Sequence, residues 1–186
     1  MEVQMYFDKP GKDNTDQALK LAAQRAKELS IDEIVVASIS GFTANRAGEI
    51  FNGCRITAVT YHSGFKEPFK NEMSADVKAD LQKKGITVLA ASHALSGVER
   101  SIAKKHSGVY PVLIIADTLR LFGQGIKVAV EVAVMAADAG ALTGKDIIAI
   151  GGSGRGADAA LVLKPAHQNN FFDMRIREVI CKPRTF

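Results

Sequence analysis

The chain has 186 residues, a length typical of one folded domain, and 47% of them are hydrophobic while 24% are charged. Sixteen glycines against five prolines exclude a collagen-like or proline-rich chain. The net charge of +4 comes from 24 basic and 20 acidic residues mixed along the sequence, and only 6% of the residues are aromatic. Nucleic-acid binders gather basic residues on one face with interleaved aromatics. We therefore expect one soluble domain over residues 1–186, with no nucleic-acid partner and a mild bias toward anionic small ligands.

The cysteines and the N-terminus indicate the compartment. Cys54 and Cys181 share no C-x-x-C spacing, and a single disulfide between them stays open as an alternative. Residues 1–12 lack the basic-then-apolar pattern of a signal peptide. The longest uncharged apolar run, 109–116, is far shorter than the ~20 residues that a membrane span requires. The sequence thus predicts a cytoplasmic protein with reduced thiols and no membrane contact.

Helices and short apolar strands alternate in the first half of the chain. Asn14 and Gln17 fit a capping box at the start of a helix with apolar residues at helical spacing. The β-branched run that follows is short enough for a strand buried on both faces. The predicted elements are helices over 14–29, 43–53 and 74–84, and strands over 34–39, 55–60 and 86–91.

The second half opens with helices. Ser96 and Glu99 match a second capping box, which begins a helix that runs to about His106. Pro111 suits the first turn of another helix, which continues through Phe122.

The next helix, over 126–139, is apolar almost all round. Lys127 and Glu131 form an i,i+4 pair on its rare polar face. A helix of this kind is buried, either between a sheet and a neighbouring helix or at a subunit interface. On this basis we expect a homo-oligomer.

The order of the elements predicts an α/β fold. Alternating helices and unpatterned apolar strands are typical of layered folds with a mostly parallel sheet. The closing strands, over 147–150, 160–163 and 176–181, have no helices between them. Because parallel neighbours need a crossover of a dozen or more residues, we expect an antiparallel edge or a hairpin near the C-terminus.

The loop S-I-S-G-F-T-A, residues 38–44, fits ligand binding because it joins a predicted strand to a helix. Ligands bind at the carboxyl ends of strands in α/β folds. Gly41 lets the backbone approach a phosphate, the hydroxyls of Ser38, Ser40 and Thr43 can donate hydrogen bonds, and the helix start supplies free amides. The alternative, in which Thr43 is only an N-cap and Gly41 a turn residue, fits the spacing equally well.

The glycine-rich loop G-G-S-G-R-G-A-D, residues 151–158, follows another predicted strand. Successive amides in such a loop can form an anion-binding nest. The loop also matches the dinucleotide fingerprint, but that motif needs a full helix next, and here a short apolar run leads to Pro165. We therefore reject a Rossmann site and expect anion binding in preference to a plain turn. The candidate contacts are Gly152, Ser153, Gly154, Arg155 and Gly156.

Two histidines and their neighbours extend this candidate site. His62 and His93 fall just past predicted strands, next to Thr60 and Ser92. These positions share the sheet edge of the first loop, so all four are candidate ligand contacts. For each histidine taken alone, a surface position without a task is the alternative. The sequence has no hydrolase elbow, metal-binding spacing or paired acidic motif, so we assign no catalytic residue and no metal site.

Four motifs carry a resemblance to known proteins. They are Y-F-x-x-P-G-x-x-N-T at 6–15, S-G-F-T-A at 40–44, F-G-Q-G-x-K-V-A-V-E at 122–131, and the glycine-rich loop. Their combination resembles a family of stand-alone archaeal and bacterial proteins with the fold of the pyruvate kinase C-terminal domain. The resemblance implies a three-layer α/β/α fold and binding of flavin mononucleotide (FMN), with residues 40–43, including Phe42, at the phosphate.

In pyruvate kinases, a related S-G-[RF]-[TS]-A loop helps to hold the phosphate of a sugar-phosphate effector. Phe42 replaces the basic residue of the S-G-R version, which leaves room for a flatter ligand. The catalytic parts of pyruvate kinase lie in another domain, so the resemblance implies no kinase activity. Two hypotheses follow, and both have a phosphorylated small molecule as partner. One is a flavin-dependent redox protein of unidentified substrate, and the other is a sensor that binds a sugar phosphate without catalysis.

Overall fold

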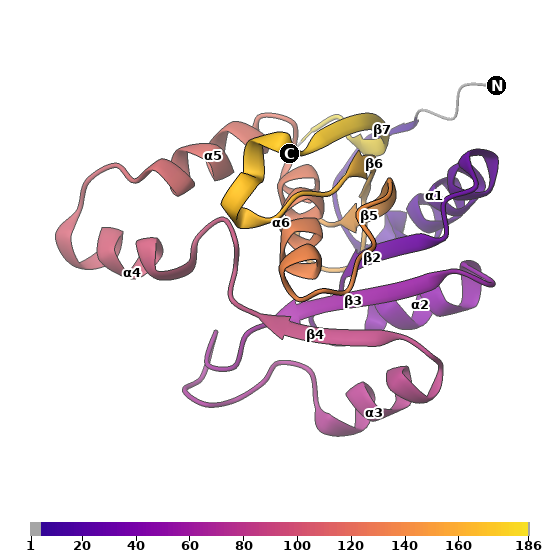
Figure 1. The fold of residues 1–186 in the computed structure, drawn as a ribbon, viewed down its shortest axis with the longest axis horizontal. Coiled ribbons are helices and arrows are strands. Elements are labelled where there is room, and N and C mark those ends of the chain that lie inside the picture. Colours follow the sequence, from indigo (N-terminus) through magenta and orange to yellow (C-terminus); the bar gives the residue numbers. More distant parts are fainter. Residues whose placement is uncertain (1–4, 186) are drawn as a thin grey trace.

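Seven strands form one mixed sheet in the computed structural model, which describes residues 5–185 (Figure 1). The strands are β1 (Met5–Phe7), β2 (Glu33–Ala37), β3 (Arg55–Tyr61), β4 (Thr87–Ala91), β5 (Ile147–Gly151), β6 (Ala159–Lys164) and β7 (Arg175–Pro183). Their order is β1-β7-β6-β5-β2-β3-β4. Strand β6 runs antiparallel to β5 and β7, and the other pairs are parallel. This confirms the predicted fold class, although β6 lies inside the sheet because β1 extends the sheet beyond β7.

Helices cover both faces of the sheet and make three layers (Figure 1). The helices are α1 (Thr15–Leu29), α2 (Phe42–Ile50), α3 (Ala75–Lys83), α4 (Gly97–His106), α5 (Pro111–Arg120) and α6 (Gln124–Asp138), with short 3-10 segments η1 (Lys12–Asn14) and η2 (Gln168–Asp173). Helices α1, α2 and α3 pack on one face, and α6 packs on the other. Helix α5 packs on α6, and α4 and α5 together extend away from the sheet as an arm.

The two predicted capping boxes do not form. Asn14 makes no side-chain cap, and its amide instead donates to the Lys9 carbonyl at 2.7 Å. Ser96 makes no side-chain cap either, and the Glu99 carboxylate accepts the Val112 amide at 3.1 Å. In each box, one side chain that the spacing assigned to the helix start forms its hydrogen bond with a different partner: Asn14 with Lys9, and Glu99 with Val112.

An apolar layer lies on each side of the sheet. Since successive strand side chains point to opposite faces, Val35 packs toward α6, whereas Ile34 and Val36 pack toward α1 and α2. Twelve of the fifteen residues of α6 are buried inside this chain. The apolar character of this helix is therefore explained without a subunit interface, and the homo-oligomer stays a prediction.

Within residues 5–185, no helix combines the length and the apolarity needed to cross a bilayer. Cys54 and Cys181 are both free.

The strand order creates a topological switch point between β2 and β5. From β2 the chain moves outward through β3 to β4, and after α4, α5 and α6 it returns to β5 on the other side of β2. In open α/β sheets, ligands bind in the crevice beyond the carboxyl ends of the strands at such a point.

We expect Leu161→Ala to lower the free energy of unfolding by about 2–5 kcal/mol, because it leaves a cavity in a well-packed core. Leu161 lies on β6 and is fully buried. As a control, Leu121→Ala removes a side chain that is 74% exposed, and it should change stability by less than about 0.5 kcal/mol. Urea denaturation measures both, and equal losses would contradict the assigned core.

Candidate functional site

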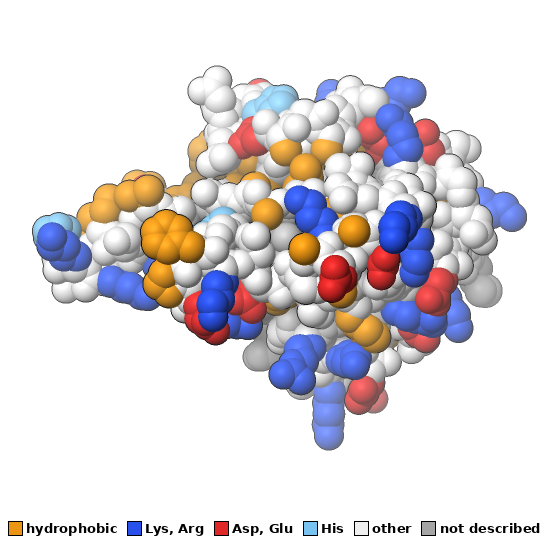
Figure 2. Space-filling model, turned by 90° about the horizontal axis from the view of Figure 1, so that it is seen from below, with side chains coloured by type: hydrophobic (Ala, Val, Ile, Leu, Met, Phe, Trp, Pro, Cys, Tyr) orange, Lys and Arg blue, Asp and Glu red, His pale blue; other side chains and the backbone are white. Residues whose placement is uncertain are grey.

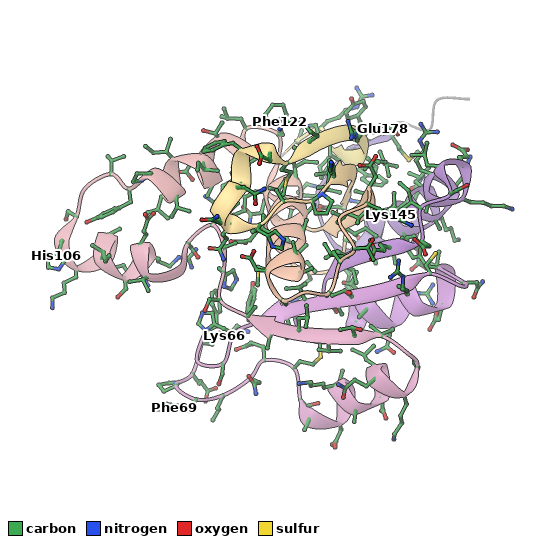
Figure 3. The ribbon with its side chains drawn as sticks, viewed as in Figure 1. Lys66, Phe69, His106, Phe122, Lys145 and Glu178 are labelled. Atoms are coloured by element: carbon green, nitrogen blue, oxygen red, sulfur yellow. The ribbon has the colours of Figure 1, made fainter. Side chains whose placement is uncertain are left out.

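A cavity of about 540 Å³ opens at the carboxyl edge of the sheet, a volume typical of small-ligand sites. The loops after β2, β3, β4 and β5 and the first half of α6 supply its wall. Figure 3 shows Lys66 in the loop after β3, at this edge, and His106 at the tip of the α4–α5 arm.

Most of the predicted ligand contacts line this cavity. They are Ser38, Ser40, Phe42, Thr43, Thr60, His93, Gly152, Gly154, Arg155 and Gly156. Gly41, His62, Ser92 and Ser153 do not belong to its wall. Gly41 is the N-cap of α2 with φ +90, where a Cβ would lie 2.3 Å from a methyl group of Val77. The ring of His62 instead lies edge-on to those of Phe65 and His93.

The starts of three helices approach one end of the cavity, which we call the anion end. Helix α2 begins at Phe42, and the amides of Phe42 and Thr43 have no intrahelical acceptor. Ser38 Oγ caps the same helix by accepting the Ala44 amide at 3.1 Å, whereas the alternative interpretation of the sequence gave that role to Thr43. Lys12, just before α1, and Gln124, the first residue of α6, also line the cavity. Amides and positive dipole ends in this arrangement favour an anion.

The glycine-rich loop reaches this end because Asp158 fixes its shape. The Asp158 carboxylate is fully buried and accepts the Gly11 amide at 2.8 Å, the Ser153 amide at 3.2 Å and the Ser153 hydroxyl at 3.2 Å. Burial raises the pKa of Asp158, and these hydrogen bonds act in the opposite direction. Ser153 therefore points to Asp158 and away from the cavity, where the sequence analysis had placed it as a ligand contact.

Two glycines let this loop pack backbone against backbone. A Cβ on Gly152 would lie 2.2 Å from the Gly156 carbonyl oxygen. A Cβ on Gly156, where φ is +74, would lie 2.3 Å from Thr15 Oγ1. Thr15 Oγ1 also accepts the Ala157 amide at 3.1 Å, which ties the loop to the start of α1. The loop is thus a tightly packed turn whose backbone faces the cavity.

Basic side chains outnumber acidic ones in the wall of the cavity. The basic residues are Lys12, Lys66, Arg100, Arg120, Lys127 and Arg155, and the acidic ones are Glu72 and Glu131. The Lys12 ammonium lies 4.2 Å from the centre of the Phe42 ring. A cation is therefore present beside Phe42, the position at which the S-G-R version of the loop has its own basic residue. On the face shown in Figure 2, basic and acidic side chains are both spread over the surface. The cavity itself therefore favours an anionic ligand.

Aromatic rings form the other end of the cavity, which we call the aromatic end. Tyr61 closes β3 and Phe65 follows it, with ring centres 4.1 Å apart. The His93 ring, after β4, lies 4.9 Å from Phe65 and 5.1 Å from Tyr61. The glycine-rich loop follows β5, which lies two strands from β3 and three strands from β4. At a strand spacing of about 4.8 Å, the loop is therefore about 10–14 Å from the strands that carry the aromatic end.

One polar atom at the aromatic end lacks a partner. His93 Nδ1 is buried and makes no hydrogen bond with any of the residues described. Burial lowers the pKa of His93, and the charge of Glu131 acts in the opposite direction. A buried polar atom without a partner costs about 1–3 kcal/mol, so this nitrogen marks a place where a bound molecule would gain a hydrogen bond.

The pair Lys127–Glu131 also belongs to the wall, a role that the sequence analysis missed. Lys127 Nζ donates to Glu131 Oε2 at 2.5 Å, and both side chains are only 4% exposed. Glu131 Oε1 accepts the Leu95 amide at 2.9 Å. Burial lowers the pKa of Lys127, while Glu131 opposes the shift. A helix that is apolar almost all round must be buried, and charged side chains on it need polar surroundings. The two charges of Lys127 and Glu131 were therefore the sequence signal that could have placed these residues in a cavity.

No metal-binding group of three His, Cys or acidic side chains occurs in residues 5–185.

Lys127→Met should lower the free energy of unfolding by about 3–5 kcal/mol, because it leaves Glu131 buried without a counter-charge. The double variant Lys127→Met/Glu131→Leu removes both charges and should regain most of that loss. Urea denaturation of the single and double variants gives the comparison. A double variant less stable than Lys127→Met would show that the charges do not act as a pair.

Acid should destabilise the protein through His93. Its folded-state pKa lies below the ordinary 6.5, so below pH 6.5 the unfolded chain takes up a proton that the folded chain does not. Stability is therefore lost as pH falls below about 6.5 toward the lower pKa that His93 has in the folded state. In thermal denaturation, His93→Gln should flatten this slope, whereas Leu121→Ala, which removes no titratable group, should leave it unchanged. An unaltered slope in His93→Gln would contradict the assignment.

Comparison with known proteins places this fold in a family. Residues 16–163 match the family described as pyruvate kinase, alpha/beta domain. Similar solved structures include a pyruvate kinase from Cryptosporidium parvum, CGD1_2040 (15% identity, 79% of this chain and 22% of that one, TM-score 0.40). Two others are Cryptosporidium parvum pyruvate kinase (16%, 77% and 21%, TM-score 0.37) and the same enzyme in complex with ADP (15%, 87% and 23%, TM-score 0.38). This chain spans about a fifth of the length of those enzymes. By the match over residues 16–163, the chain belongs to the pyruvate kinase alpha/beta domain family.

Proposed function

We propose that this protein binds a phosphorylated ligand with a planar ring system across the carboxyl edge of its sheet, and that FMN is the first candidate. The observation that carries the proposal is the cavity with two unlike ends. One end offers amides and cations, and the other offers aromatic rings and an unpartnered ring nitrogen.

The anion end suits a phosphate group. Free amides at the start of α2 and the backbone of the glycine-rich loop supply hydrogen-bond donors. Arg155 and Lys12 supply positive charge. The Arg155 side chain is exposed and has no ion-pair partner in the part of the chain that the structure describes, so its guanidinium is free to bind a phosphate oxygen.

The aromatic end suits a flat ring. Phe65 and Tyr61 can stack on it, and Val132 of α6 adds an apolar side chain to the same cavity. His93 Nδ1 can make a hydrogen bond with a polar atom at the ring edge. When bound, FMN supplies the electron-transfer chemistry of its ring, while the protein positions the ring and excludes water. A flavin-dependent redox activity on an unidentified substrate follows as the catalytic form of this proposal.

A sugar phosphate is the second candidate, and one observation favours it. Lys12 over the Phe42 ring restores a cation beside that loop, and Arg100 and Arg120 add charge that a single phosphate does not need. In that case the protein is a sensor without catalysis. Pyruvate kinase activity forms no part of either proposal.

An absorption spectrum of the concentrated, desalted protein is the first test, because a retained flavin band identifies the ligand directly. The apoprotein is then titrated with FMN, and flavin fluorescence reports binding. Riboflavin, which lacks the phosphate, is the matched control ligand. FMN should bind at micromolar concentration and riboflavin at least tenfold more weakly. A rise in melting temperature with a hexose bisphosphate and none with FMN would select the sensor, since a ligand stabilises the state that binds it.

Arg155→Ala should weaken FMN binding about tenfold or more. A hydrogen bond to a charged group contributes about 1.5–3 kcal/mol, and 1.4 kcal/mol corresponds to a factor of ten. Lys145→Ala removes the same charge from an exposed position before β5, far from Lys66 and the cavity edge (Figure 3). It should leave FMN affinity unchanged in the same fluorescence titration. Equal weakening by both variants would indicate a nonspecific charge effect and refute the assigned phosphate end.

A further inference from the structure

The buried amine of Lys127 has the surroundings of a nucleophile. The side chain is 4% exposed, and it lines the cavity from the first turns of α6. A lysine amine reacts with carbonyl carbons only as the neutral base, and burial favours the neutral form. A lysine with only a structural role has no need to face a cavity that also collects phosphate-binding groups.

A proton acceptor for this amine is already in place. Glu131 Oε2 lies 2.5 Å from Lys127 Nζ. The other oxygen, Oε1, is fixed by the Leu95 amide at 2.9 Å, so the carboxylate cannot turn away from the amine. Glu131 is therefore positioned to take a proton from the ammonium and to return it later.

The cavity also defines the class of molecule that would reach the amine. Arg100 and Arg120 line the cavity with Lys127, and the charge of each lowers its pKa, as burial does. The anion end lies beside the first turn of α6, where Gln124 is also in the wall. A small molecule with its phosphate at the anion end would therefore present its remaining atoms to Lys127.

We propose that Lys127 forms an imine with the carbonyl carbon of a small phosphorylated aldehyde or ketone. The proposal rests on the anion end of the proposed function and deepens its sugar-phosphate form. The Lys127 ammonium gives one proton to Glu131, and the neutral amine attacks the carbonyl carbon to form a carbinolamine. Glu131 returns the proton to the hydroxyl group, which leaves as water. Ammonium and carbonyl thus give a protonated imine and water, with no oxidant or reductant.

Reductive trapping tests the proposal on the full chain. The protein is incubated with dihydroxyacetone phosphate and borohydride, which converts the imine into a stable amine, and peptide mass mapping locates the adduct. We expect one adduct, on Lys127. Dihydroxyacetone, which lacks the phosphate, should label at least ten times more slowly. Excess inorganic phosphate should slow the labelling by competing for the anion end.

Two variants separate chemistry from structure. Lys127→Arg keeps a positive charge for Glu131 but cannot form an imine, so it should fold and show no adduct. Glu131→Gln keeps the amine and should trap at least ten times more slowly. Lys78→Arg, on an exposed face of α3, is the matched control and should be labelled like the unaltered protein. Mapping of the unaltered protein decides the question even where a variant fails to fold.

The outcomes distinguish this proposal from the one on which it rests. Stabilisation by dihydroxyacetone phosphate in thermal denaturation without any adduct would overturn the imine and leave the anion end intact. Adducts spread over surface lysines, and equal in Lys127→Arg, would also overturn it. Neither stabilisation nor an adduct would overturn the imine together with the sugar-phosphate form of the proposed function, while the flavin titration decides the FMN form separately.

Discussion

The carboxylate of Asp158 joins three segments that are distant in the sequence. It binds the amide of Gly11 before α1 and both donors of Ser153 in the glycine-rich loop. It also lies against Gly125 at the start of α6, where a Cβ would stand 2.6 Å from Oδ1. Since a buried carboxylate is stable only when its oxygens are satisfied, the segment before α1 and the glycine-rich loop must meet at this point, and α6 comes close to it because Gly125 has no side chain. The anion end of the cavity depends on that meeting, because it brings the starts of α1 and α6 to the loop after β5.

Much of the fold could be predicted from the sequence because its signals are local. Apolar runs without alternation indicated strands buried on both faces, and their order indicated a mostly parallel sheet. The same order placed the loops at 38–44 and 151–158 at one edge, where ten of the predicted contacts now line one cavity. The capping boxes at Asn14 and Ser96 did not form, because the Asn14 side chain binds the Lys9 carbonyl and the Glu99 side chain binds the Val112 amide, and the capping pattern contains neither partner.

The remainder of the site required the tertiary structure. Tyr61 and Phe65 flank the predicted His62, but only the turn after β3 shows that their rings and His93 pack together. The pair Lys127–Glu131 was assigned to a polar face because helical spacing gives the direction of a side chain and not what it meets. Its place in the wall follows from the position of α6 over β2 and β5 at the switch point. The sequence thus indicated which loops line the cavity, but not which side chains meet between them.

The pairing of β1 with β7 bears on how the chain could be rearranged. Met5 stands opposite Cys181 and Phe7 opposite Pro183, so the first and last strands are neighbours at the border of the sheet. The turn between α4 and α5, at Gly108 and the 81% exposed Val109, carries none of the groups that line the cavity. Because the two strands are parallel, a linker of about a dozen residues or more could lead from the end of β7 back to the start of β1 while the backbone is opened at that turn. Such a circular permutant would retain every strand pairing and the cavity in a chain of different order.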